Sequence, residues 1–130
     1  MTSQFPENPR RSLRVLVLDD DYGWRNSVAF SLESTTGIEP LVASSGKQAL
    51  KILSEHSIDV VVSDLLMPEM DGFQILKRLR VLYPQIKVIL MSGDFGAFPI
   101  SPHLMIEQGA FAAVPKSEIT SVLPDLLRNL

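Results

Sequence analysis

The stretch from Ile58 to Gly72, IDVVVSDLLMPEMDG, constrains the fold of this chain more than any other. Its three consecutive valines at 60–62 are typical of a strand that is buried on both faces. Asp64 follows within apolar sequence, where a carboxylate is costly to bury unless it has a partner. Met67-Pro68 ends the strand, and Asp71-Gly72 predicts a turn that opens a helix. Asp64 is therefore predicted at the carboxyl end of a central strand, where open α/β sheets bind ligands.

Strand and helix patterns alternate along the rest of the chain. We predict further strands at residues 13–18, 40–43, 86–91 and 110–114, and helices after each strand. Such alternation implies right-handed βαβ units and a parallel sheet with helices on both faces. Pro115 favours an edge position for the last strand, because proline cannot donate to a neighbouring strand.

The helices give more specific expectations about packing and caps. Helical spacing predicts two inward-facing sets, one of Trp24, Val28 and Leu32 and one of Ile75, Leu76, Leu79 and Leu82. Asp21, Ser44 or Ser45, Asp71 and Ser101 are candidate N-caps. Pro124 lies in the middle of the last helix, from about residue 117 to 129, and predicts a kink or two short pieces.

Length and composition limit the possible classes of protein. The 130 residues, 45% of them hydrophobic, fit one globular domain, and residues 1–12 are polar and predict a flexible tail rather than a signal peptide. The net charge of −3 argues against direct nucleic-acid binding. There is no cysteine, and His56 and His103 are too scattered for a zinc site. No apolar run approaches the roughly 20 residues of a membrane span, so the cytoplasm is the expected compartment.

Polar residues of a definite kind follow four of the predicted strands. These are Asp19-Asp20, Asp64, Ser92 and Lys116. If the strands are parallel, all of them meet at one edge of the sheet, where three close carboxylates repel one another unless a hard cation joins them. A Mg²⁺ ion held there would leave positions for phosphate oxygens, and a hydroxyl and an ammonium group would bind the others. The pattern predicts phosphoryl transfer to a carboxylate nucleophile.

With these motifs together, the sequence resembles the receiver domain of two-component response regulators. The resemblance extends from about Leu13 to the C-terminus, so the expected receiver domain is 13–130. Its motifs are VLVLDD, VVVSDLLMPEMDG, the MSG after the fourth strand and GAFAAVPK, and ASSGKQAL fits the second helix of the family. The resemblance implies an α/β, doubly wound, flavodoxin-like fold: a five-stranded parallel sheet of order 2-1-3-4-5.

The resemblance also implies a role for each residue of the site. Asp64 would accept a phosphoryl group from the phosphohistidine of a sensor histidine kinase or a histidine phosphotransfer protein. Asp19, Asp20 and Asp64, with the backbone carbonyl of Leu66, would hold Mg²⁺. Ser92 and Lys116 would bind the phosphoryl group, and Leu66 and Asp94 would flank it and set its lifetime.

At the level of the whole domain, the resemblance implies a signalling module rather than a turnover enzyme. Such a module catalyses only its own phosphorylation and dephosphorylation. A homodimer could form through the face made by the fourth helix, the fifth strand and the fifth helix. The chain is either a stand-alone regulator or part of a longer protein.

Two positions depart from the family pattern. Ser117 follows the lysine where the family usually has proline, and Pro115 precedes it. Ala113 replaces the aromatic residue that usually lies three positions before the lysine, and Phe111 lies two residues earlier. We therefore expect phosphorylation to be transmitted by the backbone of the loop at residues 93–100 rather than by an aromatic side chain.

Two alternative functions are compatible with parts of this pattern. One is a receiver-fold docking module that signals without phosphorylation. The other is a phosphatase of the haloacid dehalogenase type, whose D-x-D signature is superficially matched by the sequence DDDYG. That family also requires an acidic pair beyond the lysine, whereas only Glu118 and Asp125 follow here, and it leaves Asp64 unexplained.

Overall fold

The strands and helices alternate as the sequence predicts. The computed structural model describes residues 13–130, so the predicted tail at residues 1–12 lies outside the described residues. The elements are, in order, β1 (Val15–Leu18), α1 (Tyr22–Thr36), β2 (Leu41–Ala43), α2 (Gly46–Glu55), β3 (Val60–Asp64), α3 (Gly72–Leu82), β4 (Lys87–Ser92), η2 (Phe95–Ala97), α4 (Pro102–Glu107), β5 (Ala112–Pro115) and α5 (Lys116–Arg128).

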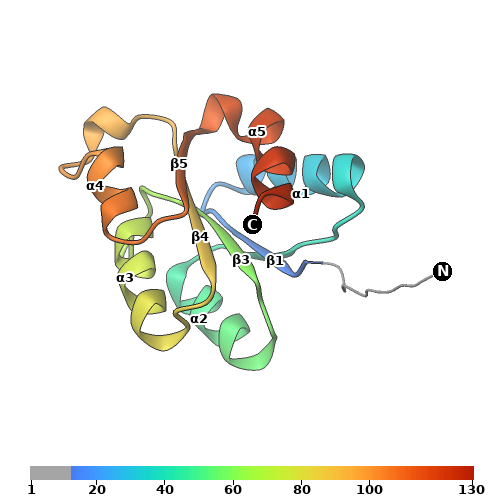
Figure 1. Ribbon diagram of the computed structural model, residues 1–130, viewed down its shortest axis with the longest axis horizontal. Helices are drawn as coiled ribbons and strands as arrows, with labels where there is room; N and C mark the ends of the chain where they lie inside the picture. Colours follow the sequence, from blue (N-terminus) through green and yellow to red (C-terminus); the bar gives the residue numbers. More distant parts are fainter. Residues whose placement is uncertain (1–12) are drawn as a thin grey trace.

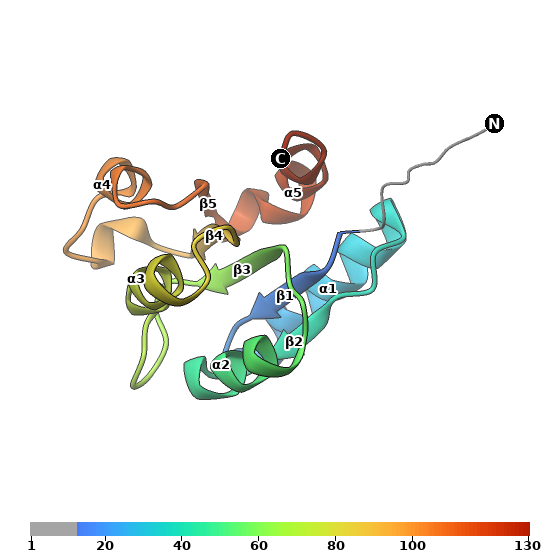
Figure 2. The same cartoon turned by 60° about the horizontal axis from the view of Figure 1, so that its bottom comes forward.

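The five strands form one parallel sheet in the order β2-β1-β3-β4-β5 (Figures 1 and 2). The predicted strand order is therefore confirmed, and β5 is an edge strand as Pro115 suggested. All five residues of β3 are buried, which matches its central position. Because the strands are parallel, their carboxyl ends lie at the same edge of the sheet.

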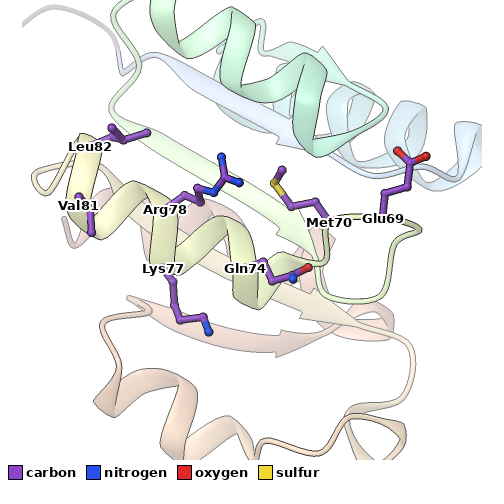
Figure 3. A pocket seen from close by; sticks show the side chains of 7 residues that line it. All are labelled: Glu69, Met70, Gln74, Lys77, Arg78, Val81 and Leu82. Atoms are coloured by element: carbon purple, nitrogen blue, oxygen red, sulfur yellow. The ribbon is translucent and has the colours of Figure 1, made fainter.

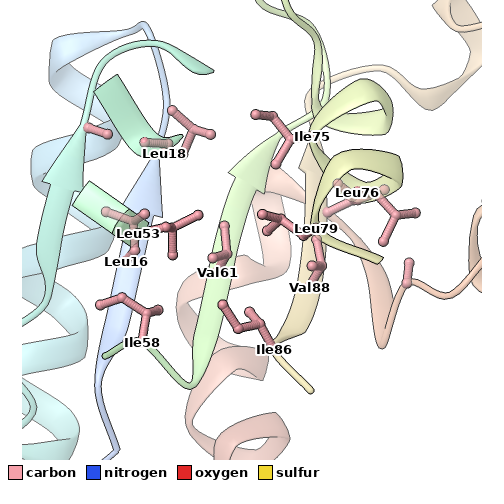
Figure 4. Close-up of a cluster of buried hydrophobic side chains, with 14 of the residues drawn as sticks. Leu16, Leu18, Leu53, Ile58, Val61, Ile75, Leu76, Leu79, Ile86 and Val88 are labelled. Atoms are coloured by element: carbon pink, nitrogen blue, oxygen red, sulfur yellow. The ribbon is translucent and has the colours of Figure 1, made fainter. Parts of the chain in front are cut away.

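The sheet separates two hydrophobic cores. Successive strand residues point to opposite faces, so Val61 packs with α2 and α3, whereas Val60 and Val62 pack with α1 and α5. Figure 4 shows the first of these cores, which is filled by side chains such as Leu16, Leu53 and Leu79. Helices thus cover both faces, which holds the strand ends in fixed positions around the site.

Side-chain caps fix where four helices begin. Asp21 accepts a hydrogen bond from the Trp24 amide, and Ser45 and Ser101 cap α2 and α4 in the same way. Asp71 forms a capping box with Gln74 at the start of α3. Each of these caps was expected from the sequence, with Ser45 rather than Ser44 in the case of α2.

Two packing predictions are wrong. Leu82 is 56% exposed, because α3 ends there and Tyr83, one helical turn beyond Leu79, packs against the core instead. Trp24 is 37% exposed and does not belong to the buried set of α1, which contains only Val28 and Leu32. Of the two outcomes predicted for Pro124, division of the helix is excluded because α5 is continuous, whereas a kink stays a prediction.

The continuity of α5 across Pro124 has a physical explanation. A proline inside a helix costs about 3 kcal/mol, because it removes one hydrogen bond and crowds the preceding turn. Ile119, Leu123 and Leu127 are all buried against the sheet. Each large apolar side chain that is buried contributes about 1.5–3 kcal/mol, so packing outweighs the cost of the proline.

Candidate functional site

Asp19 lies directly after β1 and makes three hydrogen bonds with neighbouring segments. Its side chain is fully buried, and its Oδ1 accepts a hydrogen bond of 2.9 Å from the amide of Asp21. Its own amide donates to the Ala43 carbonyl, and its carbonyl accepts from the Arg25 guanidinium at 2.9 Å. Asp20, by contrast, is exposed. The first strand therefore supplies one rigid and one solvent-facing carboxylate.

Asp64 is the last residue of β3 and is 6% exposed. The chain turns sharply after it, and the Gly72 amide donates to the Leu65 carbonyl at 2.8 Å. A Cβ atom at position 72 would lie 2.4 Å from the Asp64 carbonyl oxygen, so only glycine fits there. Gly72 thereby allows the first turn of α3 to pack directly behind Asp64.

The carboxylates and the lysine converge as the sequence predicts. One oxygen atom from each of Asp19, Asp20 and Asp64 lies within 4.8 Å of the others. Lys116, the first residue of α5, places its Nζ 2.8 Å from Asp19 Oδ2 and 3.4 Å from Asp64 Oδ2. Residues from three segments that are far apart in the sequence therefore form one charged cluster at the carboxyl edge of the sheet.

The local environment changes the protonation of this cluster. Burial, together with the neighbouring charge of Asp19, raises the pKa of Asp64 to about 6, although Lys116 acts in the opposite direction. Burial alone would lower the pKa of Lys116, but its close contact with Asp19 and the charge of Asp64 raise it instead. Lys116 therefore stays charged. Additional positive charge near Asp64 would stabilise the ionised form of its carboxylate.

The donor atoms fit a hard divalent cation. Asp19 Oδ2 is buried and, among the described residues, accepts no hydrogen bond of good geometry; the Lys116 ammonium lies 2.8 Å from it as an ion pair. The three carboxylates offer only oxygen, the ligand type that Mg²⁺ prefers. The cluster can therefore hold a metal ion, which would satisfy Asp19 and relieve the repulsion between Asp19 and Asp64.

Ser92 and Asp94 follow β4 and contact each other. The Ser92 side chain is 1% exposed, and its Oγ accepts a hydrogen bond of 3.0 Å from the Asp94 amide. The Asp94 carboxylate accepts from the Gly96 amide and caps η2. Within residues 13–130, no hydrogen bond joins Ser92 to Asp64, although Met91, which precedes Ser92 in β4, pairs with Asp64 in β3.

Leu66 lies in the loop after β3, and its side chain is 43% exposed. Leu66 is thus an apolar residue two positions after Asp64 whose side chain is partly accessible to solvent. The role of its carbonyl as a metal ligand stays a prediction.

Sequence reasoning missed two residues of this region. The Trp24 ring lies under the Lys116 ammonium, with 5.3 Å between Nζ and the ring centroid. Arg25 binds the Asp19 carbonyl and stacks on Tyr22. Both residues lie in the first turns of α1, just after the acidic pair. That position indicated that their side chains could reach the site, whereas helical periodicity assigned Trp24 to the core.

Phe111 cannot replace the missing aromatic residue near Lys116. Its ring contacts Lys87, the first residue of β4, so Phe111 lies at the opposite end of the sheet from Ser92. Ala113 pairs with Leu90 and is half-buried. The position near the site that the family usually fills with an aromatic side chain is therefore occupied by a methyl group.

A hollow of about 570 Å³ lies apart from the charged cluster. Figure 3 shows the residues that line it, which come from α3 and the preceding loop. Its lining includes Lys77, Arg78 and the exposed Val81, but none of the residues that converge around Asp64.

Among the helices of residues 13–130, none has both the length and the apolar character that crossing a membrane would require.

Comparison with known proteins places this site in a family. The model of the response regulator receiver domain matches residues 15–128. A putative response regulator, NtrX-like, of Rickettsia felis is 41% identical over 119 residues, which cover 90% of this chain and 24% of that protein. Sporulation initiation phosphotransferase F of Bacillus subtilis is 40% identical over 82 residues, 61% of this chain and 63% of that protein. The chain spans 17% to 24% of the length of the NtrX-like relatives.

Solved structures agree with the sequence comparisons. The chemotaxis protein CheY4 of Vibrio cholerae superposes with a TM-score of 0.76 at 26% identity, covering 92% of this chain and 98% of that one. A response regulator receiver protein of Pseudomonas putida reaches a TM-score of 0.82 at 22% identity over 93% of this chain and 99% of that one, which supports the fold alone. The sheet order, the acidic cluster and the sequence match lead to one conclusion: this chain belongs to the response regulator receiver domain family of two-component signalling.

Proposed function

We propose that Asp64 is the phosphoryl-accepting residue of this receiver domain. The observation that supports this most strongly is the position of its carboxylate, 3.4 Å from the Lys116 ammonium and within 4.8 Å of two further carboxylates. In the reaction, one Asp64 oxygen would form a bond to phosphorus while the phosphorus–nitrogen bond of a phosphohistidine breaks. The electron pair of that bond would leave with the imidazole, and an acyl phosphate would remain on Asp64.

Asp19, Asp20 and Asp64, together with the carbonyl of Leu66, would hold Mg²⁺. The ion supplies positive charge at the point where phosphate oxygens approach three carboxylates. Asp19 suits this role because it is already fixed by the Asp21 amide and Arg25. Burial and the charge of Asp19 raise the pKa of Asp64 to about 6 without a metal, and a bound cation would lower it, so the ion would favour the ionised carboxylate that acts as nucleophile.

Lys116 and Ser92 would bind the transferred group. The Lys116 ammonium lies beside Asp64 and would pair with a phosphoryl oxygen. Ser92 now accepts a hydrogen bond from the Asp94 amide, so its own hydrogen remains available to donate to a phosphoryl oxygen. Leu66 and Asp94 would modulate the lifetime of the acyl phosphate, since they lie two residues beyond Asp64 and Ser92.

The partners follow from this chemistry. The phosphoryl donor would be a sensor histidine kinase or a histidine phosphotransfer protein in the cytoplasm, and no nucleic acid would bind to this domain directly. A homodimer could form through the face of α4, β5 and α5. The domain would act as a signalling module that catalyses only its own phosphorylation and dephosphorylation, not as a turnover enzyme.

Phosphoryl uptake from acetyl phosphate tests this proposal. We expect about one equivalent of phosphoryl group per chain in the presence of Mg²⁺ and none with a chelator, because the carboxylates repel the donor without the ion. Steady release of many equivalents of p-nitrophenol from p-nitrophenyl phosphate would instead indicate a phosphatase. No uptake from either acetyl phosphate or phosphoramidate would leave the docking module as the better account.

A further inference from the structure

Trp24 and Lys116 lie at the same edge of the molecule although they are far apart in the sequence. Trp24 belongs to the first turn of α1, and Lys116 begins α5. These two helices lie side by side on one face of the sheet (Figure 1). Lys116 Nζ is 2.8 Å from Asp19, 3.4 Å from Asp64 and 5.3 Å from the centroid of the Trp24 ring. The ammonium group is therefore enclosed between two carboxylates and an aromatic face.

This enclosure explains how the Lys116 side chain can be largely buried. A lysine side chain has a long flexible stem and loses considerable rotamer entropy when it is fixed. Its side chain is nevertheless only 11% exposed, while Trp24 is 37% exposed. The indole ring is attracted to the cation through its quadrupole, most strongly among the aromatic side chains. Without the ring, the stem would have more freedom to leave the site.

The position of Lys116 also determines whether its ammonium pairs with Asp19 or with Asp64. It is closer to Asp19 than to Asp64 in this structure. A metal ion on Asp19 would compete for the same carboxylate and would repel the ammonium, so Lys116 would need another interaction to remain beside Asp64. An aromatic face can provide that interaction, because it attracts a cation but has no net charge that a metal ion could neutralise.

We propose that Trp24 is a positioning residue, which holds the Lys116 ammonium beside Asp64 for phosphoryl transfer. This inference rests on the proposed function of Asp64, but the contact between ring and ammonium can be measured without any phosphorylation. Trp24 would not touch the reacting atoms and would act only through Lys116.

The first measurement is the ring-current shift of the Lys116 ε-methylene protons. In the metal-free and in the Mg²⁺-bound wild-type protein, we expect these protons upfield of ordinary lysine signals, because the adjoining ammonium lies over the indole ring. The shift should vanish in Trp24→Leu and persist in reduced form in Trp24→Phe. An ordinary chemical shift in the Mg²⁺-bound wild-type protein would overturn the proposal, and this result depends on no variant.

The second measurement is the rate of phosphoryl uptake from phosphoramidate at saturating Mg²⁺. A cation–π contact that is partly shielded from water predicts a rate about three- to tenfold lower in Trp24→Leu, with partial recovery in Trp24→Phe. Phe30→Leu is a matched control, since Phe30 lies on the same helix and is 73% exposed. It should leave the rate unchanged.

The outcomes separate this inference from the proposed function. An unchanged rate in a folded Trp24→Leu protein would contradict the positioning role even if Asp64 is phosphorylated normally. Equal losses in Trp24→Leu and Phe30→Leu would also overturn it, because they would indicate a general effect on α1. If the wild-type protein accepts no phosphoryl group at all, the proposed function fails, whereas the ring-current shift still reports whether Trp24 holds Lys116.

Discussion

At the scale of single residues, the surroundings of Asp64 distinguish it from the exposed carboxylates on the rest of the surface. Its side chain is buried beside the fully buried Asp19, and both share the single ammonium of Lys116. Burial, together with the charge of Asp19 that the one ammonium does not offset, raises the pKa of Asp64 to about 6. The same residues that suit a metal ion therefore destabilise the metal-free fold at neutral pH.

This imbalance predicts a pH dependence of stability. Because the pKa of Asp64 is higher in the folded than in the unfolded chain, its contribution to stability is fully present below about pH 4 and is lost as the pH rises through about 6. We compare the free energy of unfolding of the wild type with that of Asp64→Asn in the presence of a chelator. The wild-type value minus the variant value should fall by on the order of 2 kcal/mol from about pH 4 to about pH 7. Urea unfolding at several pH values measures this difference. A constant difference would contradict the assigned environment.

We predict that substitutions at Leu66 and Asp94 change the lifetime of the phosphorylated form. Leu66 is an apolar side chain two residues after Asp64, so Leu66→Asn should admit and bind water and speed autodephosphorylation several-fold. Asp94→Ala removes a carboxylate that now caps η2, and the direction of its effect will distinguish a water-orienting role from simple repulsion. Loss of phosphoryl label over time measures both rates. If both variants lose the label at the wild-type rate, neither residue modulates it.

At the scale of elements, the sequence predicts position better than orientation. The valines of β3 and the caps at Asp21 and Asp71 depend on neighbours along the chain, and they are found as expected. Trp24 and Leu82 were wrongly assigned to the interior, because the face that a helix buries depends on the sheet against which it packs. The continuity of α5 across Pro124 has the same origin, since its buried side chains belong to the tertiary structure.

The close packing of the start of α3 against the end of β3 predicts the effect of a substitution at Gly72. A methyl group at position 72 would contact the Asp64 carbonyl and the Leu65 Cα, both of which are backbone atoms that cannot move aside cheaply. Gly72→Ala should therefore destabilise the fold by about 2–4 kcal/mol, as overpacking against a rigid backbone does. Gly93→Ala is the matched control, because nothing lies within 4 Å of its added methyl group. Chemical denaturation compares the two variants, and equal stability would refute the argument.

At the scale of the whole molecule, parallel topology explains why the site could be predicted at all. Asp19, Asp64 and Lys116 lie at one edge because the strands are parallel, which the alternating pattern predicted. The order of the strands was implied by the family resemblance alone. Contacts between helices of different units could not be read in the same way. Trp24 reaches Lys116 only because α1 and α5 lie side by side, which no local pattern specifies.

The arrangement of the whole molecule also predicts how phosphorylation would be transmitted. Ala113 is too small to fill the space that a moving Ser92 would vacate, and Phe111 lies at the other end of the sheet. The response should therefore appear in the backbone from Gly93 to Ile100 and in α4. Amide NMR shifts with and without beryllofluoride measure it. Changes restricted to the site residues, with 95–107 silent, would exclude this loop, and a full loop response in Ser92→Ala would exclude Ser92 from the route.

The most direct test of the account is to identify the residue that takes up the phosphoryl group. Wild-type protein and Asp64→Asn are incubated with phosphoramidate and Mg²⁺, and intact mass and peptide mapping after trapping with hydroxylamine are compared. We predict one hydroxylamine-sensitive modification in the wild type, located at Asp64, and none in the variant. Undiminished labelling of Asp64→Asn, or a modification mapped to another residue in the wild type, would contradict the central claim.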